Sequence, residues 1–378
     1  MARNASSHIE TTRGRALFVG SDVYREAAFG RHHPLSIIRV AGVVDVCERL
    51  GWFEPGQFRD SPRANEAQLT KFHDPDYVAA LRAADAAGRV DPAVRRRYRI
   101  GTMENPLFPG LYRRASTAVG GSIHAAELAL DGGVVFHPSG GTHHGRPDRA
   151  SGFCYFNDPV FALLTLLENG LERVLYVDLD AHHGDGVQDA FANDPRVMTV
   201  SIHEEKRWPH SGPVEDRALG AARNLPVPAG FNDDELDFLM REAVLPLART
   251  FGPEAVVVTC GADPLAGDPL SRLELSNVGL WRAVESLVEL TQRSVVLGGG
   301  GYNPWTVVRC WSGLWGRLSG REIPTELPGP VRDLLAGFEC DLIDEEDVPE
   351  TWRTRLADEP NHGPVRPQIE ALPALVLH

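Results

Sequence analysis

The chain alternates between two kinds of segment, and this alternation restricts the folds that are open to it. Stretches with helical periodicity are followed by a glycine-bearing turn and then by a short, almost wholly apolar run. Four of these runs read "VVFHPSGG", "VLYVDLD", "AVVVTCGAD" and "SVVLGGGG". Strands that are apolar on both faces are typical of parallel sheets covered by helices on both sides. The sequence therefore predicts an α/β fold around a doubly wound parallel sheet.

No linker-like stretch rich in proline, serine or glycine divides residues 15–320. We therefore expect one domain over residues 14–325, although 378 residues would allow two or three. Residues 1–13 are expected to be disordered. The acidic, proline-containing residues 326–378 are expected to form an extension that packs on the domain or trails from it.

Charge and cysteine usage exclude several classes of partner. The net charge is −14, which argues against nucleic acid or an anionic membrane surface as the main partner. The five cysteines are odd in number and form no CxxC pair, so a disulfide framework and a thiolate zinc site are not expected. There is no apolar leader and no run of 18 apolar residues. We expect a cytoplasmic protein, and self-association stays open.

Ionisable side chains gather directly after the predicted strands. In a parallel sheet, ligands bind beyond the carboxyl ends of the strands, so these groups are expected to share one edge. The groups that follow the four runs are His143 and His144, then Asp178, Asp180, His182, His183 and Asp185, then Asp263 and Asp268, and finally Gly298–Gly301 with Tyr302.

The "DLDAHH" segment has the donor types of a metal site. Asp178 and Asp180 lie two apart on a strand and so leave the same face, and His182 follows where the chain turns. An aspartate, a histidine and a distant aspartate would leave a tetrahedral zinc ion one open position for water, as catalytic zinc requires. A magnesium or phosphate site, or a capped turn, is the simpler alternative for this segment alone.

The other strand ends also have simpler alternatives. A histidine pair can be an accident of surface or core, but the glycines of "GGTHHG" let backbone approach a ligand closely. The run Gly298–Gly301 can be a strand-to-helix turn or a phosphate cradle, although GxGxxG and GKS/GKT spacings are absent. Tyr302 can be a core tyrosine or a phenol aimed at a neighbouring site.

Six motifs occur in an order that resembles the histone deacetylase superfamily, which includes acetoin-utilisation proteins, acetylpolyamine amidohydrolases and related amidohydrolases. They are "HHPLSIIRV", "GGTHHGRPDRASGFCYFND", "VLYVDLDAHHGDGVQDAF", "VMTVSIH", "GADPLAGDPL" and "GGGGYN". The resemblance spans about residues 15–325. It implies a three-layer arginase-like fold in which a parallel sheet of about eight strands lies between helices, and it makes residues 14–325 a deacetylase-like catalytic domain.

The resemblance also implies two ion sites. One zinc ion would be bound by Asp180, His182 and Asp268. A structural potassium or sodium ion would be bound by Asp178, Asp180, His182, Ser201 and the backbone of Ile202.

Catalytic roles follow from the same resemblance. Asp178 would pair with His143 and Asp185 with His144, which fixes the tautomers of both imidazoles. His144 would be the general base and later the acid to the leaving amine, with His143 as its more buried partner. Tyr302 would donate to the developing oxyanion.

Six further positions would form the substrate channel. Phe153 and Trp208 match the aromatic walls, and Trp208 stands where phenylalanine is common. The others are the carbonyl of Gly152, the apolar side chain of Leu270, Glu104 at the rim and Arg39 at the foot of the pocket. Leu270 replaces a glutamate that would favour a cationic polyamine, and Glu104 stands where many members have aspartate to hold a peptide backbone.

The sequence thus predicts a zinc-dependent amide hydrolase that removes acetyl or short acyl groups from acyl-lysine-like amines or small-molecule amides. An acetylpolyamine amidohydrolase is the alternative. A binuclear manganese ureohydrolase is more remote, because its DAHxD spacing wants an aspartate two residues after the histidine, whereas Asp185 follows His182 by three. A non-catalytic acyl-ligand binding protein is the third class, since a fold does not guarantee activity.

Overall fold

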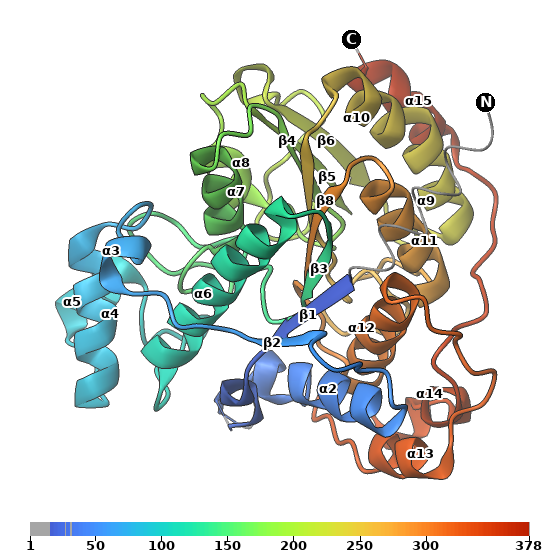
Figure 1. Cartoon of the computed structure of the whole chain (residues 1–378), viewed down its shortest axis with the longest axis horizontal. Helices are drawn as coiled ribbons and strands as arrows, with labels where there is room; N and C mark the ends of the chain where they lie inside the picture. Colours follow the sequence, from blue (N-terminus) through green and yellow to red (C-terminus); the bar gives the residue numbers. More distant parts are fainter. Residues whose placement is uncertain (1–15, 27, 31, 378) are drawn as a thin grey trace.

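The computed structural model describes residues 16–26, 28–30 and 32–377, so the predicted disorder of residues 1–13 lies outside the described part (Figure 1). Eight strands form one sheet in the order β2-β1-β3-β8-β7-β4-β5-β6, and every pairing is parallel. The strands are β1 Ala16–Gly20, β2 Phe58–Asp60, β3 Gly133–His137, β4 Val174–Asp178, β5 Val197–Glu204, β6 Ala222–Val227, β7 Ala255–Thr259 and β8 Arg293–Leu297. The predicted α/β class and eight-stranded parallel sheet are confirmed.

Helices cover both faces of the sheet (Figure 1). They are α2 Val40–Arg49, α3 Glu66–Leu69, α4 Pro75–Ala87, α5 Pro92–Tyr98, α6 Leu111–Leu130, α7 Asp158–Glu168, α8 Asp185–Ala190, α9 Asp233–Leu239, α10 Leu245–Phe251, α11 Asn277–Val288, α12 Pro304–Leu318, α13 Gly329–Ala336, α14 Glu350–Thr354 and α15 Pro367–Val376. One apolar cluster joins α6, α7 and α8 to one face, and a larger one joins α2, α9, α10, α11 and α12 to the other.

The strands that carry the candidate site are central and fully buried. Every residue of β3, β4 and β7 is buried, because alternate side chains enter the two apolar clusters on opposite faces. In β4, Leu175 and Val177 face the larger cluster, while Val174 and Tyr176 face the other. Asp178 is the last residue of this strand, so its carboxylate lies at the carboxyl edge of the sheet.

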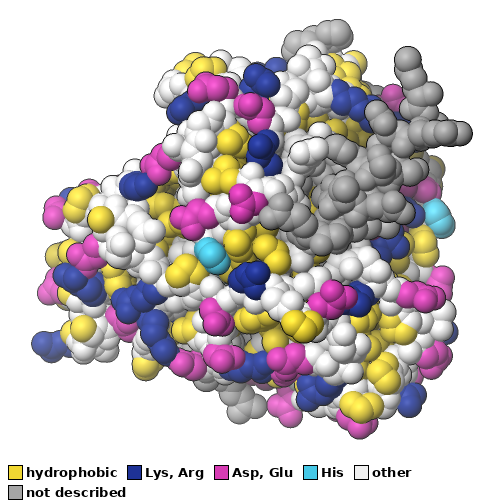
Figure 2. Space-filling model, viewed as in Figure 1, with side chains coloured by type: hydrophobic (Ala, Val, Ile, Leu, Met, Phe, Trp, Pro, Cys, Tyr) yellow, Lys and Arg dark blue, Asp and Glu magenta, His cyan; other side chains and the backbone are white. Residues whose placement is uncertain are grey.

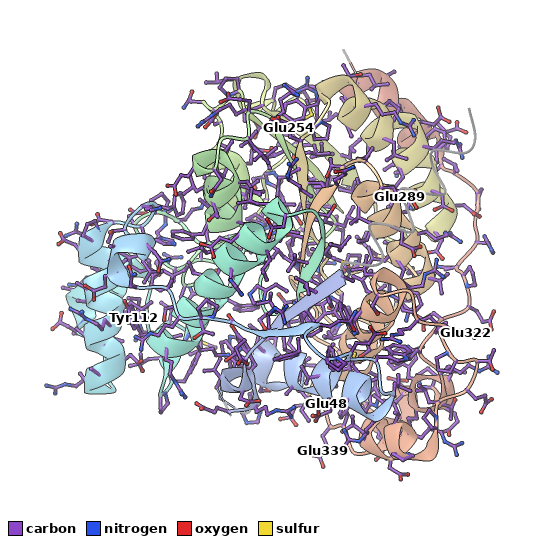
Figure 3. All side chains as sticks on the ribbon, in the orientation of Figure 1. Glu48, Tyr112, Glu254, Glu289, Glu322 and Glu339 are labelled. Atoms are coloured by element: carbon purple, nitrogen blue, oxygen red, sulfur yellow. The ribbon has the colours of Figure 1, made fainter. Side chains whose placement is uncertain are left out.

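A smaller lobe lies beside the sheet. Helices α3, α4 and α5 pack on α6 through a third apolar cluster that includes Tyr77, Leu81 and Tyr98 (Figure 1). Tyr112 marks the part of α6 that faces this lobe in Figure 3. The loop from α5 to α6 carries Glu104 from the lobe to the carboxyl edge of the sheet.

The residues after 325 are held against the domain by buried polar contacts. Arg309 of α12 is fully buried, and its Nη2 lies 2.6 Å from Oδ1 of Asp358. Its Nε donates to the carbonyl of Arg355 at 2.6 Å. Because a buried guanidinium needs such acceptors, this segment completes the packing of α12.

The visible surface mixes acidic and basic side chains with scattered apolar ones (Figure 2). Among the described residues, no helix is both long enough and apolar enough to cross a membrane. Glu254, labelled in Figure 3, accepts the backbone N–H groups of Glu172 and Arg173 at 2.8 and 3.0 Å. These contacts lie where β4 and β7 begin, at the edge of the sheet opposite the candidate site.

Candidate active site

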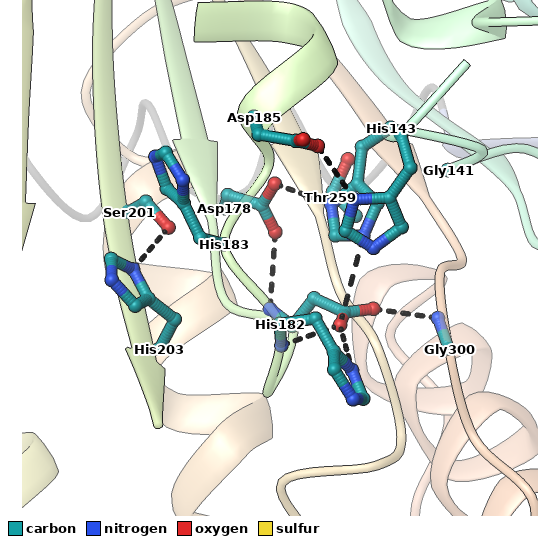
Figure 4. A network of polar contacts seen from close by, with 12 residues as sticks. Gly141, His143, Asp178, His182, His183, Asp185, Ser201, His203, Thr259 and Gly300 are labelled. Carbon is teal, nitrogen blue, oxygen red and sulfur yellow. Dashed lines mark hydrogen bonds and ion pairs between the residues drawn. The ribbon is translucent and has the colours of Figure 1, made fainter. Parts of the chain in front are cut away.

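The loops that follow β3, β4, β7 and β8 bring their polar groups together, as the strand-end pattern predicted (Figure 4). His143 Nδ1 lies 2.7 Å from Oδ2 of Asp178, and this oxygen also accepts the Tyr176 hydroxyl at 2.8 Å. The other oxygen of Asp178 accepts the N–H of Asp180 at 3.1 Å. The Asp178 carboxylate is therefore held by three donors and fixes the His143 ring.

The second histidine has its own carboxylate. His144 Nδ1 lies 2.8 Å from Oδ1 of Asp185, the first residue of α8. Burial and the neighbouring charge of His143 lower the pKa of His144 to about 3. For His143, burial acts in the same direction, but the charges of Asp178 and Asp180 outweigh it and raise its pKa to about 9. Two adjacent imidazoles are thus driven toward opposite protonation states, which is typical of an acid–base site.

Buried acidic groups cluster around His182. Donor atoms of Asp180, His182 and Asp263 all lie within 4.8 Å of one another. His182 Nδ1 is 2.8 Å from Oδ2 of Asp263 and 3.2 Å from Oδ1 of Asp180. Burial and the charge of Asp180 raise the pKa of Asp263 to about 6. For His182, hydrogen bonds to Asp180 and Asp263 outweigh burial and raise its pKa to about 10.

The closely spaced group shares Asp180 and His182 with the ligand set that the resemblance implied. Asp263, and not Asp268, belongs to the closely spaced group with Asp180 and His182. Asp268 instead accepts the N–H of Tyr302 at 2.7 Å and that of Leu270 at 2.9 Å. It still lies in the same electrostatic environment, because burial and the charge of Asp263 raise its pKa well above the usual value.

Tyr302 lines the same pocket as His144 and His182. Its ring lies edge-on to Phe153, with centroids 5.9 Å apart, and 6.5 Å from the ring of His182. Burial raises the pKa of the phenol well above its usual value, so Tyr302 stays a proton donor through the neutral range. The glycines before it let the chain approach Asp180, whose Oδ2 accepts the N–H of Gly300 at 2.6 Å.

These groups form the floor and walls of a pocket of about 310 Å³. The predicted channel residues that line it are Glu104, Gly152, Phe153, Trp208 and Leu270, together with His144, His182 and Tyr302. Arg39 does not line this pocket. It lies in a neighbouring cavity of about 350 Å³ that shares Phe153 as a wall, and its Nη2 donates to the carbonyl of Gly299.

The mouth of the pocket is shaped by Trp208, which is 36% exposed. Its indole packs edge-on against His144 with centroids 4.5 Å apart. Gly152 has a positive φ of 54°, and a Cβ there would collide with the indole, so only glycine fits. Glu104 Oε1 accepts the N–H of Gly152 at 2.8 Å, so this rim carboxylate is used within the protein.

Three of the residues implied for a monovalent cation, Asp178, Ser201 and Ile202, lie on the neighbouring strands β4 and β5. The register of β4 and β5 pairs Asp178 with Ser201, which places Ile202 next along the same edge. Ser201 Oγ lies 2.9 Å from His203 Nδ1 (Figure 4). Burial and the charge of His183 lower the pKa of His203 to about 3, so this histidine stays neutral.

Several site residues were not predicted from the sequence as functional. From the sequence, Asp263 is only a strand-end group, and its place in the "GAD" turn five residues before Asp268 is the available signal. Tyr176 lies inside a strand and gave no signal that its hydroxyl supports Asp178. Arg207 also lines the pocket, and it pairs with the buried Glu204 three residues before it.

The loop that carries the two histidines rests on a buried neutral histidine, and this has a measurable consequence. His73 accepts the N–H of Asn157 at Nε2, and its Nδ1 lies 3.0 Å from the carbonyl of Arg146. Burial lowers the pKa of His73 from 6.5 to about 4. The unfolded chain therefore takes up a proton before the folded one does, so His73 makes folding less favourable as the pH falls from 6.5 toward 4.

We expect the free energy of unfolding to lose about 2 kcal/mol between pH 8 and pH 5 through His73 alone. Urea unfolding of the wild type and of His73→Gln at both pH values measures this, since glutamine keeps a donor and an acceptor but does not titrate. Effects of pH on metal binding are common to both proteins and cancel in the comparison. Equal pH dependence of the two proteins would contradict the assignment.

Comparison with known proteins agrees with this geometry. The model of the histone deacetylase domain matches residues 33–318. The acetoin utilization protein AcuC of Bacillus subtilis (strain 168) is 33% identical over 328 residues, which cover 83% of this chain and 84% of AcuC. A crystal structure of a histone deacetylase homologue from Aquifex aeolicus superposes with a TM-score of 0.91 at 33% identity, covering 95% of this chain and 99% of the homologue. A structure of such a homologue complexed with SAHA gives the same values. The chain therefore belongs to the histone deacetylase family.

Proposed function

We propose that this protein is a zinc-dependent amide hydrolase that removes acetyl or other short acyl groups from acyl-lysine-like amines or small-molecule amides. The observation that carries the proposal is one narrow pocket whose lining includes His144, His182 and Tyr302. The pocket therefore combines the neutral imidazole of His144, the imidazole of His182 from the buried acidic cluster, and the buried phenol of Tyr302. Among the described residues, the acidic cluster that includes His182 is the one group of three or more His, Cys, Asp or Glu side chains found close enough to hold a metal ion.

The donor set fits a divalent cation. Three buried carboxylates, Asp180, Asp263 and Asp268, surround one imidazole, and burial raises the pKa of the last two. Such an accumulation of acids is unfavourable unless a positive charge compensates it. Carboxylate and imidazole donors without thiolate are typical of catalytic zinc sites. When bound, the ion supplies Lewis acidity that polarises an amide carbonyl and makes an attacking water more acidic.

We assign the ligands to Asp180, His182 and Asp268. Asp268 accepts the N–H groups of Tyr302 and Leu270, two residues that line the pocket, and these contacts support a position for its carboxylate beside the substrate. Asp263 is fully buried, and its oxygens accept the Ala181 N–H and contact the His182 ring. Both oxygens of Asp263 are thus engaged within the protein, which favours a supporting role for it over the role of a ligand.

Two substitutions separate these roles. We expect Asp268→Asn to remove the zinc from the purified protein, because it deletes a charged ligand. Asp263→Asn should retain the site with an affinity about 10–100-fold weaker, the usual effect of losing a supporting carboxylate. Zinc titration with a competing chelator measures both values. Full zinc loss in Asp263→Asn together with wild-type affinity in Asp268→Asn would reverse the assignment.

The protein's own groups supply proton transfer and charge stabilisation. His144, neutral and held by Asp185, takes a proton from the attacking water and later gives one to the leaving amine. His143 carries positive charge beside it and so favours developing negative charge. The Tyr302 phenol donates to the amide oxygen as it becomes an oxyanion.

The pocket favours a neutral aliphatic stem. Phe153 and Trp208 offer aromatic surfaces and Leu270 an apolar contact, and one oxygen of Glu104 accepts the N–H of Gly152. Leu270 offers a cationic polyamine no carboxylate at its position, so the acetylpolyamine alternative is less favoured. The complex of a related structure with SAHA supports an elongated ligand in this family.

Two further assignments complete the proposal. A potassium or sodium ion bound by Asp178, Asp180, His182, Ser201 and the backbone of Ile202 would hold β4 and β5 together behind the site, supported by their register. A cytoplasmic location is supported by the cysteines, all five of which are free.

The test is turnover and metal content measured together. The purified protein is assayed against acetyl-lysine and butyryl-lysine peptides, acetylated polyamines and simple anilides, before and after chelation and after zinc is restored. We expect amide hydrolysis that is lost on chelation and recovered with one zinc per chain. Turnover with two manganese ions, or binding without turnover of any amide, would replace the proposal by one of the remote alternatives.

A further inference from the structure

Arg146 lies two residues after His144, and its backbone is fixed on both sides. Its N–H donates to the carbonyl of Arg149 at 3.1 Å. Its carbonyl lies 3.0 Å from Nδ1 of His73, which the N–H of Asn157 fixes as the donor by occupying Nε2. These two contacts therefore fix the backbone of Arg146 within the loop that carries His143 and His144.

The guanidinium of Arg146 contacts both aspartates of α8. Its Nη2 pairs with Oδ2 of Asp185, and its Nη1 pairs with Oδ2 of Asp189. The pair with Asp185 is shielded, with side-chain exposures of 17% for Arg146 and 8% for Asp185, whereas Asp189 is 61% exposed. Since solvent and salt weaken exposed pairs most, the contact with Asp185 is the one expected to matter.

Each oxygen of Asp185 thus has a different partner. Oδ1 lies 2.8 Å from Nδ1 of His144, and Oδ2 is held by Arg146. The terminal torsion of an aspartate is broad and nearly two-fold, so a carboxylate held at one oxygen alone can rotate. Asp178, which supports the other histidine, is fixed at its two oxygens by the Tyr176 hydroxyl and the Asp180 N–H. Arg146 thus restrains the carboxylate of Asp185 in the way that the Tyr176 hydroxyl and the Asp180 N–H restrain that of Asp178.

We propose that Arg146 is a positioning residue: it locks the Asp185 carboxylate so that His144 keeps its Nδ1–H toward Asp185 and presents Nε2 to the pocket. The kinetic consequence rests on the proposed function, because it requires His144 to carry the proton in amide hydrolysis. The effect on the His144 ring does not depend on that function. The competing explanation is that Arg146 only ties α8 to the loop, and in that case Asp189 would be as important as Asp185.

The kinetic arm of the test uses Arg146→Ala and two controls. We expect Arg146→Ala to lower kcat about 10–100-fold, as loss of a supporting partner usually does, while KM and zinc content stay near the wild-type values. Added guanidinium should restore part of kcat in this variant. Asp189→Asn should keep the wild-type kcat, as should Arg149→Ala, which removes an exposed pair with Asp148. An equal loss in Asp189→Asn, or a loss of zinc in Arg146→Ala, would overturn the proposal.

The second arm of the test measures the tautomer of the His144 ring directly and does not require turnover. In protein with 15N-labelled histidine rings, we expect a single Nδ1–H tautomer for His144 in the wild type and an averaged signal in Arg146→Ala, with His143 unchanged. His144→Gln identifies the signal. An unchanged His144 signal in Arg146→Ala would overturn the proposal even if kcat falls. If Arg146→Ala does not fold, Arg146→Gln, of similar length and without charge, takes its place under the same criteria.

The two arms separate this inference from the proposed function. A wild-type protein that hydrolyses no amide would refute the proposed function, and the ring signal alone would then decide the role of Arg146. A wild-type protein that is active and a variant with an undisturbed ring would refute only the positioning role.

Discussion

Replacing Tyr302 by phenylalanine is expected to lower kcat by about 10²–10³-fold, or about 2.7–4 kcal/mol in the barrier, while KM and zinc content stay near the wild-type values. The substitution removes one hydroxyl and leaves the ring in contact with Phe153. Because burial keeps the phenol protonated, the wild-type group is available as a donor to the proposed oxyanion. A donor that acts only in the transition state changes kcat and leaves substrate binding nearly unchanged.

Steady-state kinetics on an acetyl-lysine peptide and metal analysis of the same preparation measure this effect. Tyr112→Phe is the matched control, since this hydroxyl belongs to α6 beside the small lobe (Figure 3). We expect the control to behave as the wild type. Full activity in Tyr302→Phe would show that the oxyanion is stabilised by another group, and the role assigned to Tyr302 would have to be given up.

Asp180→Asn is expected to abolish both zinc binding and turnover. Asp180 is buried, and its oxygens accept the N–H groups of His182 and Gly300 at 2.9 and 2.6 Å. An asparagine fills the same volume but carries no negative charge, and its amide nitrogen would face one of those two donors. The variant therefore loses a charged ligand and one hydrogen bond at the centre of the cluster.

Metal content after purification, and recovery of turnover on adding zinc, check this outcome. Asp194→Asn is the control, because this aspartate pairs with Arg196 away from the pocket. We expect Asp194→Asn to retain its metal and activity. An Asp180→Asn variant that binds zinc as tightly as the wild type would remove Asp180 from the ligand set and leave Asp263 and Asp268 as the carboxylate ligands.

The order of apolar runs and strand-end groups was enough to predict the class of fold and the edge at which the site lies. Each of the four runs became a strand of the parallel sheet, because segments that are apolar on both faces have to be covered by helices. The types of donor could also be predicted, since they stand directly beside their strands. Asp178, Asp180 and His182 need only the strand period and one turn to come together.

The pairings within the site could not be predicted in the same way. Asp263 contacts His182 from a separate loop, and Arg146 reaches Asp185 only because the histidine loop and α8 lie side by side. Arg39 likewise lines a neighbouring cavity and not the pocket itself. Such contacts depend on differences of a few ångströms between elements that are far apart in the chain.

The sequence by itself determined the parallel sheet, the edge that carries the chemistry and the kinds of side chain gathered there, because strand patterning and strand-end position are local properties. Only the tertiary structure decided which carboxylate meets which histidine and why His143 and His144 have opposite pKa shifts. The physical reason is that burial and Coulomb interactions depend on distances through space, which are set by the packing of helices and loops on the sheet.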